Sequence, residues 1–209
     1  AVNRGISRNA HWIRVRLTNS HPTQAKAWVL HHETSYLDNI TIYYADSGNE
    51  MAVVELSDRR PFNDRLVAYR KLALTHATPP GKHTDLYLRL SYEKPDAISL
   101  NMHLWSEERF HRMVESENLV QGGFFGVMLT LFLFALVSAA LLKQLTYLYY
   151  ASFLFCSALM WATLNGYLFQ YVWPSGVFWH NEGVHIAFLL MTITALQFSK
   201  AFLRTKDLL

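Results

Sequence analysis

The 209-residue chain lacks several features that define common classes of protein. Its only cysteine is Cys156, so no disulfide can form within it. It contains no G-x-S-x-G nucleophile motif, no P-loop and no dinucleotide-binding fingerprint. Residues 119–142 contain no Asp, Glu, Lys, Arg or His. These absences exclude a disulfide-stapled domain and the commonest nucleotide-binding and serine-hydrolase enzymes, and we predict neither a catalytic site nor a cofactor.

The uncharged run at 119–142 is long enough to cross a bilayer. A helix rises about 1.5 Å per residue, and the hydrocarbon core is about 30 Å thick. Two further apolar segments follow, at 147–173 and 184–203. Aromatic residues mark both ends of the second, as in the belts at membrane interfaces. The three segments argue against a buried helix of a soluble core and predict a membrane region over 119–209.

The distribution of basic residues predicts the orientation of these spans. Lys143 follows the first span, the loop at 174–183 has no Lys or Arg, and Lys200, Arg204 and Lys206 gather near the last residues. Basic residues favour the cytoplasmic side, so residues 1–118 are expected outside. The first residues contain no apolar core of a signal peptide. We therefore expect that a signal peptide has been removed or lies upstream.

The first half of the chain has the sequence pattern of short β-strands. Alternation is clearest in 11–19, where Ile13, Val15 and Leu17 share one face. Six more segments have strand-like composition: 27–31, 39–45, 52–56, 70–74, 86–90 and 98–105. Turn residues separate them, so we predict an all-β antiparallel sandwich over residues 1–105.

Residues 106–118 change to helical spacing. Glu108 and Arg112 are placed for an i,i+4 pair. The segment is either a connector that couples the outer domain to the membrane or a plain solvated linker.

Exposed aromatic residues are the candidate binding groups of the outer domain. Aromatic rings stack on sugar rings, and arginines attract anionic ligands or lipid headgroups. The candidate ligand-binding residues are Trp12, Trp28, Tyr43, Tyr87, Trp105, Arg14 and Arg60. The alternative is that several of these rings cover a second sheet as core and that the arginines serve solubility.

Small and polar residues are the candidate packing and coupling groups of the membrane region. Gly122, Gly123 and Gly126 allow helices to approach closely. Asn165 and Gln197 are expected to face the bundle, and Asn165-Gly166 allows a break in the second span.

Two histidine clusters, at 31–33 and 180–185, are the nearest approach to a metal site. Adjacent residues of a strand point to opposite faces, which is poor for shared ligation. The second cluster lacks the spacing of a helical HExxH pair. We therefore predict no metal site.

Short motifs occur in a distinctive order along the chain. In the first half they are WIRVRLTN at 12–19, WVL at 28–30, LDNITIYY at 37–44, Arg60 and Phe62, the PPG turn at 79–81 and LYLRLSY at 86–92. In the second half they are GGFFGVML at 122–129 and YLYYASF at 147–153. Their order resembles the bacterial seven-transmembrane receptors with diverse intracellular signalling modules (7TMR-DISM). The first half is similar to that family's second type of extracellular domain, and the second half to the start of its seven-helix domain.

The resemblance implies a signalling receptor. Its outer domain would be a jelly-roll sandwich, related to carbohydrate-binding modules, that binds a carbohydrate or a related small molecule. The helices would pass the event to a cytoplasmic output module, often a diguanylate cyclase or a histidine kinase. Three spans and no output module are present, so we expect a fragment of a longer protein.

The resemblance also implies a place in the cell and a set of partners. The protein would be a multi-pass protein of the bacterial inner membrane with its N-terminal domain in the periplasm. The expected partners are the ligand, the lipid bilayer, the output module and a second copy in a homodimer, without nucleic acid.

A membrane-anchored enzyme or a transporter subunit is the alternative function. An enzyme needs acid, base or metal-binding groups that converge, and the two histidine clusters are the nearest candidates. A transporter needs more ionisable groups within its spans than Gln and Asn.

Overall fold

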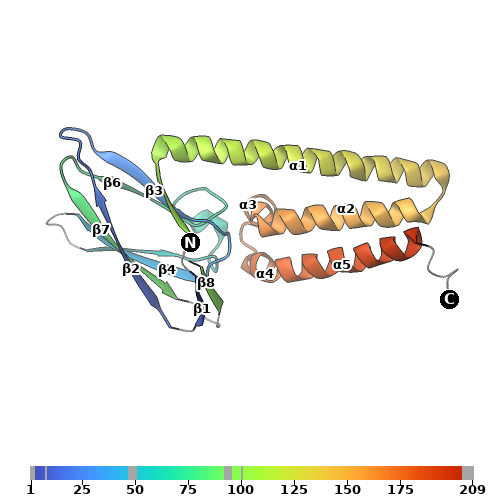
Figure 1. Cartoon of the computed structure of the whole chain (residues 1–209), viewed down its shortest axis with the longest axis horizontal. Coiled ribbons are helices and arrows are strands. Elements are labelled where there is room, and N and C mark those ends of the chain that lie inside the picture. Colours follow the sequence, from blue (N-terminus) through green and yellow to red (C-terminus); the bar gives the residue numbers. More distant parts are fainter. Residues whose placement is uncertain (1–2, 8, 47–50, 92–95, 100, 204–209) are drawn as a thin grey trace. The chain divides into compact units, whose positions relative to one another are not determined.

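A computed structural model describes residues 3–7, 9–46, 51–91, 96–99 and 101–203 of the chain (Figure 1). The chain forms two compact units. The first comprises Ala1–Arg112 together with Phe169–Val177, and the second comprises Met113–Leu168 together with Phe178–Leu209. Each unit is described by itself.

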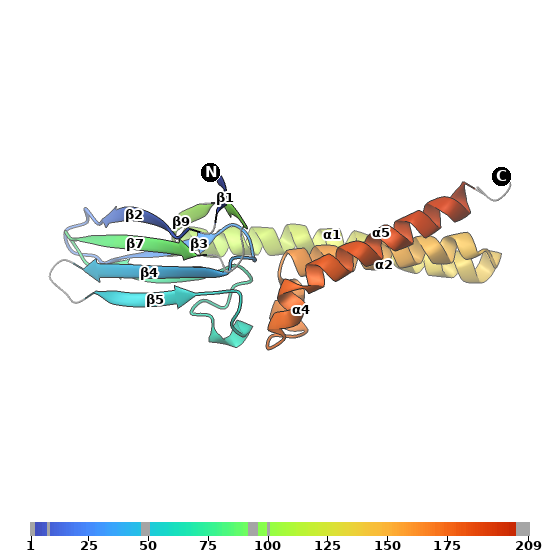
Figure 2. The same cartoon turned by 90° about the horizontal axis from the view of Figure 1, so that it is seen from below.

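The first unit consists of antiparallel β-sheets. Its elements are β1 (Asn3–Ser7), β2 (His11–Thr18), β3 (Lys26–His32), β4 (Asn39–Asp46), β5 (Ala52–Leu56), the 3-10 helix η1 (Phe62–Asp64), β6 (Ala73–Thr78), β7 (His83–Ser91), β8 (Asp96–Ser99) and β9 (Met102–Ser106). One sheet has the strand order β2-β7-β4-β5, which Figure 2 shows side by side. A second sheet has the order β6-β3-β9, and β1 pairs with β8. The order of neighbours departs from the order in the chain, so the strands are joined by crossovers.

One hydrophobic core lies between the two larger sheets. Ile42 and Leu90 are completely buried, and they come from neighbouring strands of the four-stranded sheet. Leu30 and Leu74 from the three-stranded sheet belong to the same cluster. Strand β7 alternates strictly between buried and partly exposed residues from Thr84 onward, as a strand with one buried face does. The predicted antiparallel sandwich is confirmed.

The boundaries of two strands differ from the prediction. The predicted strand at 98–105 is two strands, because β8 pairs with β1 while β9 pairs with β3. The predicted strand at 70–74 lies instead at Ala73–Thr78, where it pairs with β3. Strand β1 was not predicted from the sequence.

Residues 169–177 pack within the first unit although they follow the second apolar segment. The Phe62 N–H donates a hydrogen bond of 2.7 Å to the Pro174 carbonyl. The Phe62 and Phe169 rings meet edge to face at 5.9 Å. The Arg65 guanidinium carbon lies 5.1 Å from the Phe62 ring centre and 5.3 Å from that of Phe169. Phe169 is only 1% exposed, so this segment is an integral part of the unit.

The remaining elements are helices. They are α1 (Glu107–Leu142), α2 (Leu145–Leu164), α3 (Tyr167–Tyr171), α4 (Val177–Asn181) and α5 (Gly183–Phe202). Three of them, α1, α2 and α5, are long and apolar enough to cross a membrane. The connector and the first span form a single helix, because α1 begins directly after β9 and continues to Leu142. Gly166, at a φ of 76°, separates α2 from α3, so the break allowed by Asn165-Gly166 is present.

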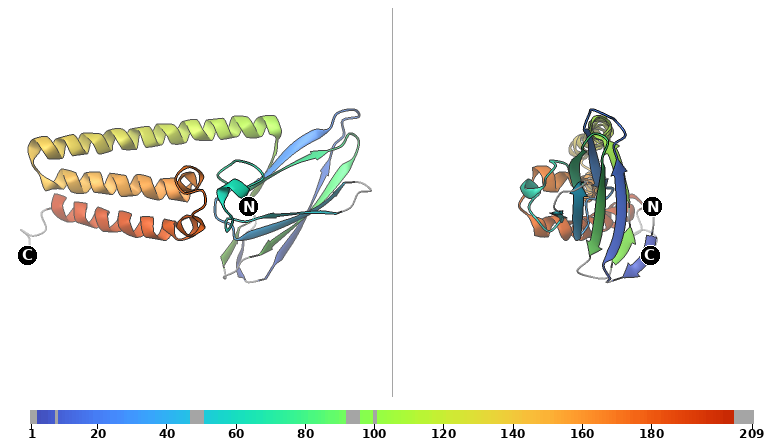
Figure 3. Two further views of the ribbon diagram at one scale, coloured as in Figure 1. Left: turned by 180° about the vertical axis from the view of Figure 1, so that it is seen from behind. Right: turned by 90° about the vertical axis from the view of Figure 1, so that its left-hand side faces the viewer.

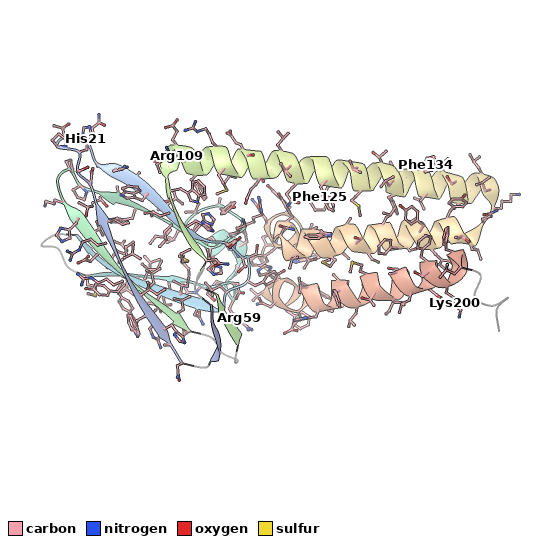
Figure 4. All side chains as sticks on the ribbon, in the orientation of Figure 1. His21, Arg59, Arg109, Phe125, Phe134 and Lys200 are labelled. Carbon is pink, nitrogen blue, oxygen red and sulfur yellow. The ribbon has the colours of Figure 1, made fainter. Side chains whose placement is uncertain are left out.

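In the second unit, α2 lies between α1 and α5 (Figures 1 and 3). Ala135 of α1 packs against Ala151 and Leu154 of α2. Phe125 lies on the inner side of α1, 5.8 Å from the Tyr167 ring, while Phe134 is exposed on the outer side (Figure 4). Only 6% of the span in α1, 11% in α2 and 6% in α5 is buried. The remaining apolar surface suits lipid or further helices.

The contact between Phe62 and Phe169 gives a first prediction. Phe62→Ala and Phe169→Ala should each lower the free energy of unfolding by roughly 3–5 kcal/mol, because each removes a buried ring. The double variant should cost less than the sum, by roughly 0.5–3 kcal/mol, since the rings contact each other. Urea unfolding of the full chain, followed by near-ultraviolet circular dichroism, measures these values. Leu66→Ala is the control, because Leu66 lies in the same loop but is 60% exposed. Strict additivity of the two phenylalanine variants would contradict the contact.

Candidate functional site

The outward face of the β2-β7-β4-β5 sheet carries an exposed aromatic residue, Trp12. Ile13, Ile42 and Leu88 point into the core, so their neighbours in the strands point outward. These outward neighbours are Trp12 and Arg14 on β2, Tyr43 on β4, and Tyr87 and Arg89 on β7. We call the outward side of this sheet the aromatic face.

The register of the strands brings these rings together. Tyr43 is directly opposite Tyr87, and Tyr87 is directly opposite Arg14. Trp12 stacks on Tyr43 with ring centres 5.5 Å apart and planes 28° from parallel. Trp12 is nevertheless 59% exposed. Such a flat, solvent-accessible ring platform is suited to bind another flat apolar surface, including the C–H face of a sugar ring.

Ion pairs hold the polar side of the aromatic face in place. Arg16 donates two hydrogen bonds to Asp85, of 2.7 and 2.8 Å, and Arg14 donates a third of 3.0 Å. The hydrogen bonds from Arg16 hold the pKa of Asp85 well below its usual range, and the hydrogen bond and the positive charge of Arg14 lower it further. The Arg14 guanidinium carbon also lies 5.6 Å from the Tyr87 ring centre. Arg14 is therefore oriented from two sides before any ligand arrives.

The structure brings four of the seven predicted ligand-binding residues together and places three elsewhere. Trp12, Tyr43, Tyr87 and Arg14 lie on the aromatic face. Arg60 follows β5 and pairs at 2.7 Å with Glu55, which points toward that face from the edge strand. The other two predicted residues, Trp28 and Trp105, lie on the three-stranded sheet.

Trp28 and Trp105 have packing roles in that sheet. Trp28 is partly buried against the core, with the Lys26 Nζ 4.3 Å above its ring. The indole N–H of Trp105 donates a hydrogen bond of 2.9 Å to His31 Nε2. Because the backbone carbonyl of His32 accepts from His31 Nδ1 at 3.0 Å, His31 is the neutral Nδ1–H tautomer.

His31 is the centre of a ring cluster that reaches the start of α1. It is 3% exposed, and the rings of Tyr69, His103 and Phe110 lie 5.9, 5.3 and 5.8 Å from it. Phe110, in the first turns of α1, is also only 3% exposed. Within the described ranges, no three His, Cys, Asp or Glu side chains are grouped to hold a metal ion. The histidine cluster at 31–33 thus contributes ring packing next to the connector helix.

A buried carboxyl group and a partly buried guanidinium lie in the loop between β5 and β6. Asp58 is 2% exposed, and its Oδ2 accepts a hydrogen bond of 2.8 Å from the Leu37 N–H. Its Oδ1 has no hydrogen-bond partner among the described residues. Burial is the main reason that the pKa of Asp58 is raised to about 6, and the negative charge of Asp38 adds a smaller rise. The hydrogen bond from the Leu37 N–H and the positive charges of Arg59 and Arg65 lower the pKa in part.

Arg65 is the second charge of this loop. Its Nη1 donates to the carbonyls of Tyr69 at 3.1 Å and of Arg70 at 2.8 Å. Burial lowers the pKa of Arg65 to about 10, partly offset by the charge of Asp58. Neither residue was predicted from the sequence, because Asp58-Arg59-Arg60 is typical of a solvated loop and its neighbours show no strand period.

The glycine candidates and Gln197 lie on open surfaces of the second unit, whereas Asn165 is partly buried. A Cβ added at Gly122, Gly123 or Gly126 would meet no described atom within 4 Å, so the close approach that these glycines allow is not made by α2 or α5. The Asn165 side chain donates a hydrogen bond of 2.9 Å to the Trp161 carbonyl at the end of α2. Gln197 is exposed on α5.

Two family models match the chain. The model described as 7TMR-DISM extracellular 2 matches residues 1–106, and the model described as 7TM diverse intracellular signalling matches residues 117–209. The first match alone covers half of the chain. No curated protein and no solved structure matches the chain.

The buried carboxyl of Asp58 predicts a pH dependence of stability. Its pKa is about 6 in the folded chain against an ordinary 3.8, so folding favours the neutral form. As the pH falls from about 7 to about 4, this group should raise the free energy of unfolding by roughly 2 kcal/mol.

Asp58→Asn should remove this contribution while keeping an oxygen for the Leu37 N–H. Urea unfolding of both chains across that pH range gives the difference, and Asp64→Asn in the exposed part of η1 is the control. Identical pH profiles for the parent chain and Asp58→Asn would contradict the assignment.

Proposed function

Since the chain belongs to the 7TMR-DISM family of seven-transmembrane receptors with diverse intracellular signalling, we propose that it is the sensing part of a bacterial receptor that binds a carbohydrate on the aromatic face. The observation that carries the proposal is the exposed stack of Trp12 on Tyr43. The Trp12 ring remains in contact with water and fills no core. A sugar ring placed on Trp12 supplies an apolar contact.

The connector supports a route from the outer domain into the membrane. β9 ends at Ser106 and α1 begins at Glu107, so no flexible residue separates sheet from helix. Phe110 anchors the first turns of α1 in the ring cluster around His31. We propose that a change in the sheet is passed to the first span along this helix. Ligand binding can shift the receptor between states only by its difference in affinity for them.

We propose that the output module lies in a part of the receptor outside this chain. We propose a diguanylate cyclase or a histidine kinase on the cytoplasmic side, as is frequent in receptors of this kind. Lys143 between α1 and α2 and Lys200 near the end of α5 support the cytoplasmic assignment of those ends, with the sandwich in the periplasm of an inner-membrane protein. A homodimer through the open surface of α1 is part of the proposal, because Gly122, Gly123 and Gly126 leave room for a second helix.

Loss of the exposed ring should weaken ligand binding. The full chain in lipid nanodiscs is screened on a glycan array, and the affinity for the best glycan is measured by tryptophan fluorescence and calorimetry. Trp12→Ala should weaken binding at least tenfold, which is about 1.4 kcal/mol, as expected for an aromatic hot spot. Leu104→Ala is the control, because Leu104 is 41% exposed on β9 of the other sheet. Unchanged affinity in both Trp12→Ala and Tyr43→Ala would refute the aromatic face as the site.

Insertions in the connector should separate binding from signalling. One to four residues inserted between Asn118 and Leu119 rotate the span relative to Phe110 by about 100° per residue. Ligand affinity should persist, while the output of the complete receptor should change with the number of residues inserted. Output that stays constant through all four insertions argues against coupling through α1.

A further inference from the structure

The aromatic face carries more positive than negative charge. Its described residues, together with Arg60 from the loop that follows β5, include four arginines and two carboxylates, leaving an excess of two positive charges. The arginines are Arg14, Arg16, Arg60 and Arg89, and the carboxylates are Asp85 and Glu55. Arg60 and Glu55 neutralise each other, whereas Arg14 and Arg16 share the single carboxylate of Asp85. The excess therefore lies on β2 and β7, beside Trp12.

Arg89 has no counter-charge among the residues that the structure describes. It is directly opposite Trp12 on one side and Thr41 on the other. Within the described part of the chain it forms no ion pair, hydrogen bond or ring contact. It is partly buried all the same. Its guanidinium nitrogens are not among the buried polar atoms that lack a partner, so they are open to solvent and to a ligand, and a bound carboxylate would accept two parallel hydrogen bonds from them.

Resting on the proposed function, we infer that the ligand is an acidic saccharide, with Arg89 and Arg14 binding its carboxylates and Trp12 stacking on its ring. A uronate unit presents both chemistries at once, since its carboxylate projects from the edge of a ring whose face is apolar. Arg14 lies on the same face, directly opposite Tyr87. Two arginines near one ring platform fit a chain of uronate units better than a neutral glycan, which would leave Arg89 without an acceptor.

The matched ligands for the test are uronate oligosaccharides and their methyl esters, which keep the ring and lose the charge. Binding is measured with the full chain in nanodiscs of zwitterionic lipid. Galacturonate, glucuronate and mannuronate oligomers are compared with the corresponding esters. At least one acid should bind tenfold or more tightly than its ester, and its affinity should fall with added salt.

Arg89→Gln should reduce the preference for the acid to less than threefold while leaving the affinity for the ester unchanged. Arg14→Gln is the second variant if Arg89→Gln does not fold, as judged by its thermal unfolding. Lys82→Gln is the matched control, because it removes the same charge from the exposed turn before β7. It should retain the full preference.

Three results would overturn the inference in different ways. Equal binding of acid and ester would reject the acidic ligand and leave the carbohydrate proposal standing. Binding of neither, with no other glycan bound on the array, would reject the carbohydrate proposal itself. Equal binding of polyphosphate or a DNA oligonucleotide would show an unselective polyanion surface, and the inference would then be wrong.

Discussion

The two-residue period of a β-strand determines which residues form the aromatic face of the outer domain. Ile42 and Leu88 are buried in the sandwich, so Tyr43 and Tyr87 have to point away from it. Antiparallel pairing then places these two tyrosines directly opposite each other. A slip of one residue would bury the tyrosines and expose the core. The stability of the sandwich and the composition of its outer surface are thus two results of one constraint.

This constraint is visible in the sequence, which explains which parts could be predicted. The alternation in 11–19 predicts Trp12 and Arg14 on the outer face, and the structure places them there. Trp28 and Trp105 stand in strands of the other sheet, and periodicity alone does not say which sheet a strand joins. Asp58 and Arg65 were missed for a different reason. Their burial depends on residues far away in the chain, and no local period records such contacts.

In the membrane region the sequence predicts the spans but not the helix surfaces that pack together. A helix satisfies its own backbone hydrogen bonds, so the length of an apolar run is enough to recognise a span. The three spans were predicted on that basis, and α1, α2 and α5 are long and apolar enough to be those spans. The predicted second span at 147–173 was too long, because α2 ends at Leu164 and residues 169–173 pack in the first unit. Which side of a span meets protein is not encoded by hydropathy, since lipid and side chains are equally apolar. Gly122, Gly123 and Gly126 illustrate this, because their surface is open although their spacing allows packing.

The packing of residues 169–177 within the first unit means that the boundaries of sequence families and of folding units do not coincide. The family match to the membrane domain includes these residues, whereas their contacts join them to the sandwich. The outer domain is therefore discontinuous in the chain. A chimera that exchanges only residues 1–112 between two receptors would set Phe62 and Arg65 of one parent against Phe169 of the other. The modular unit of exchange has to include the loop that follows the second span.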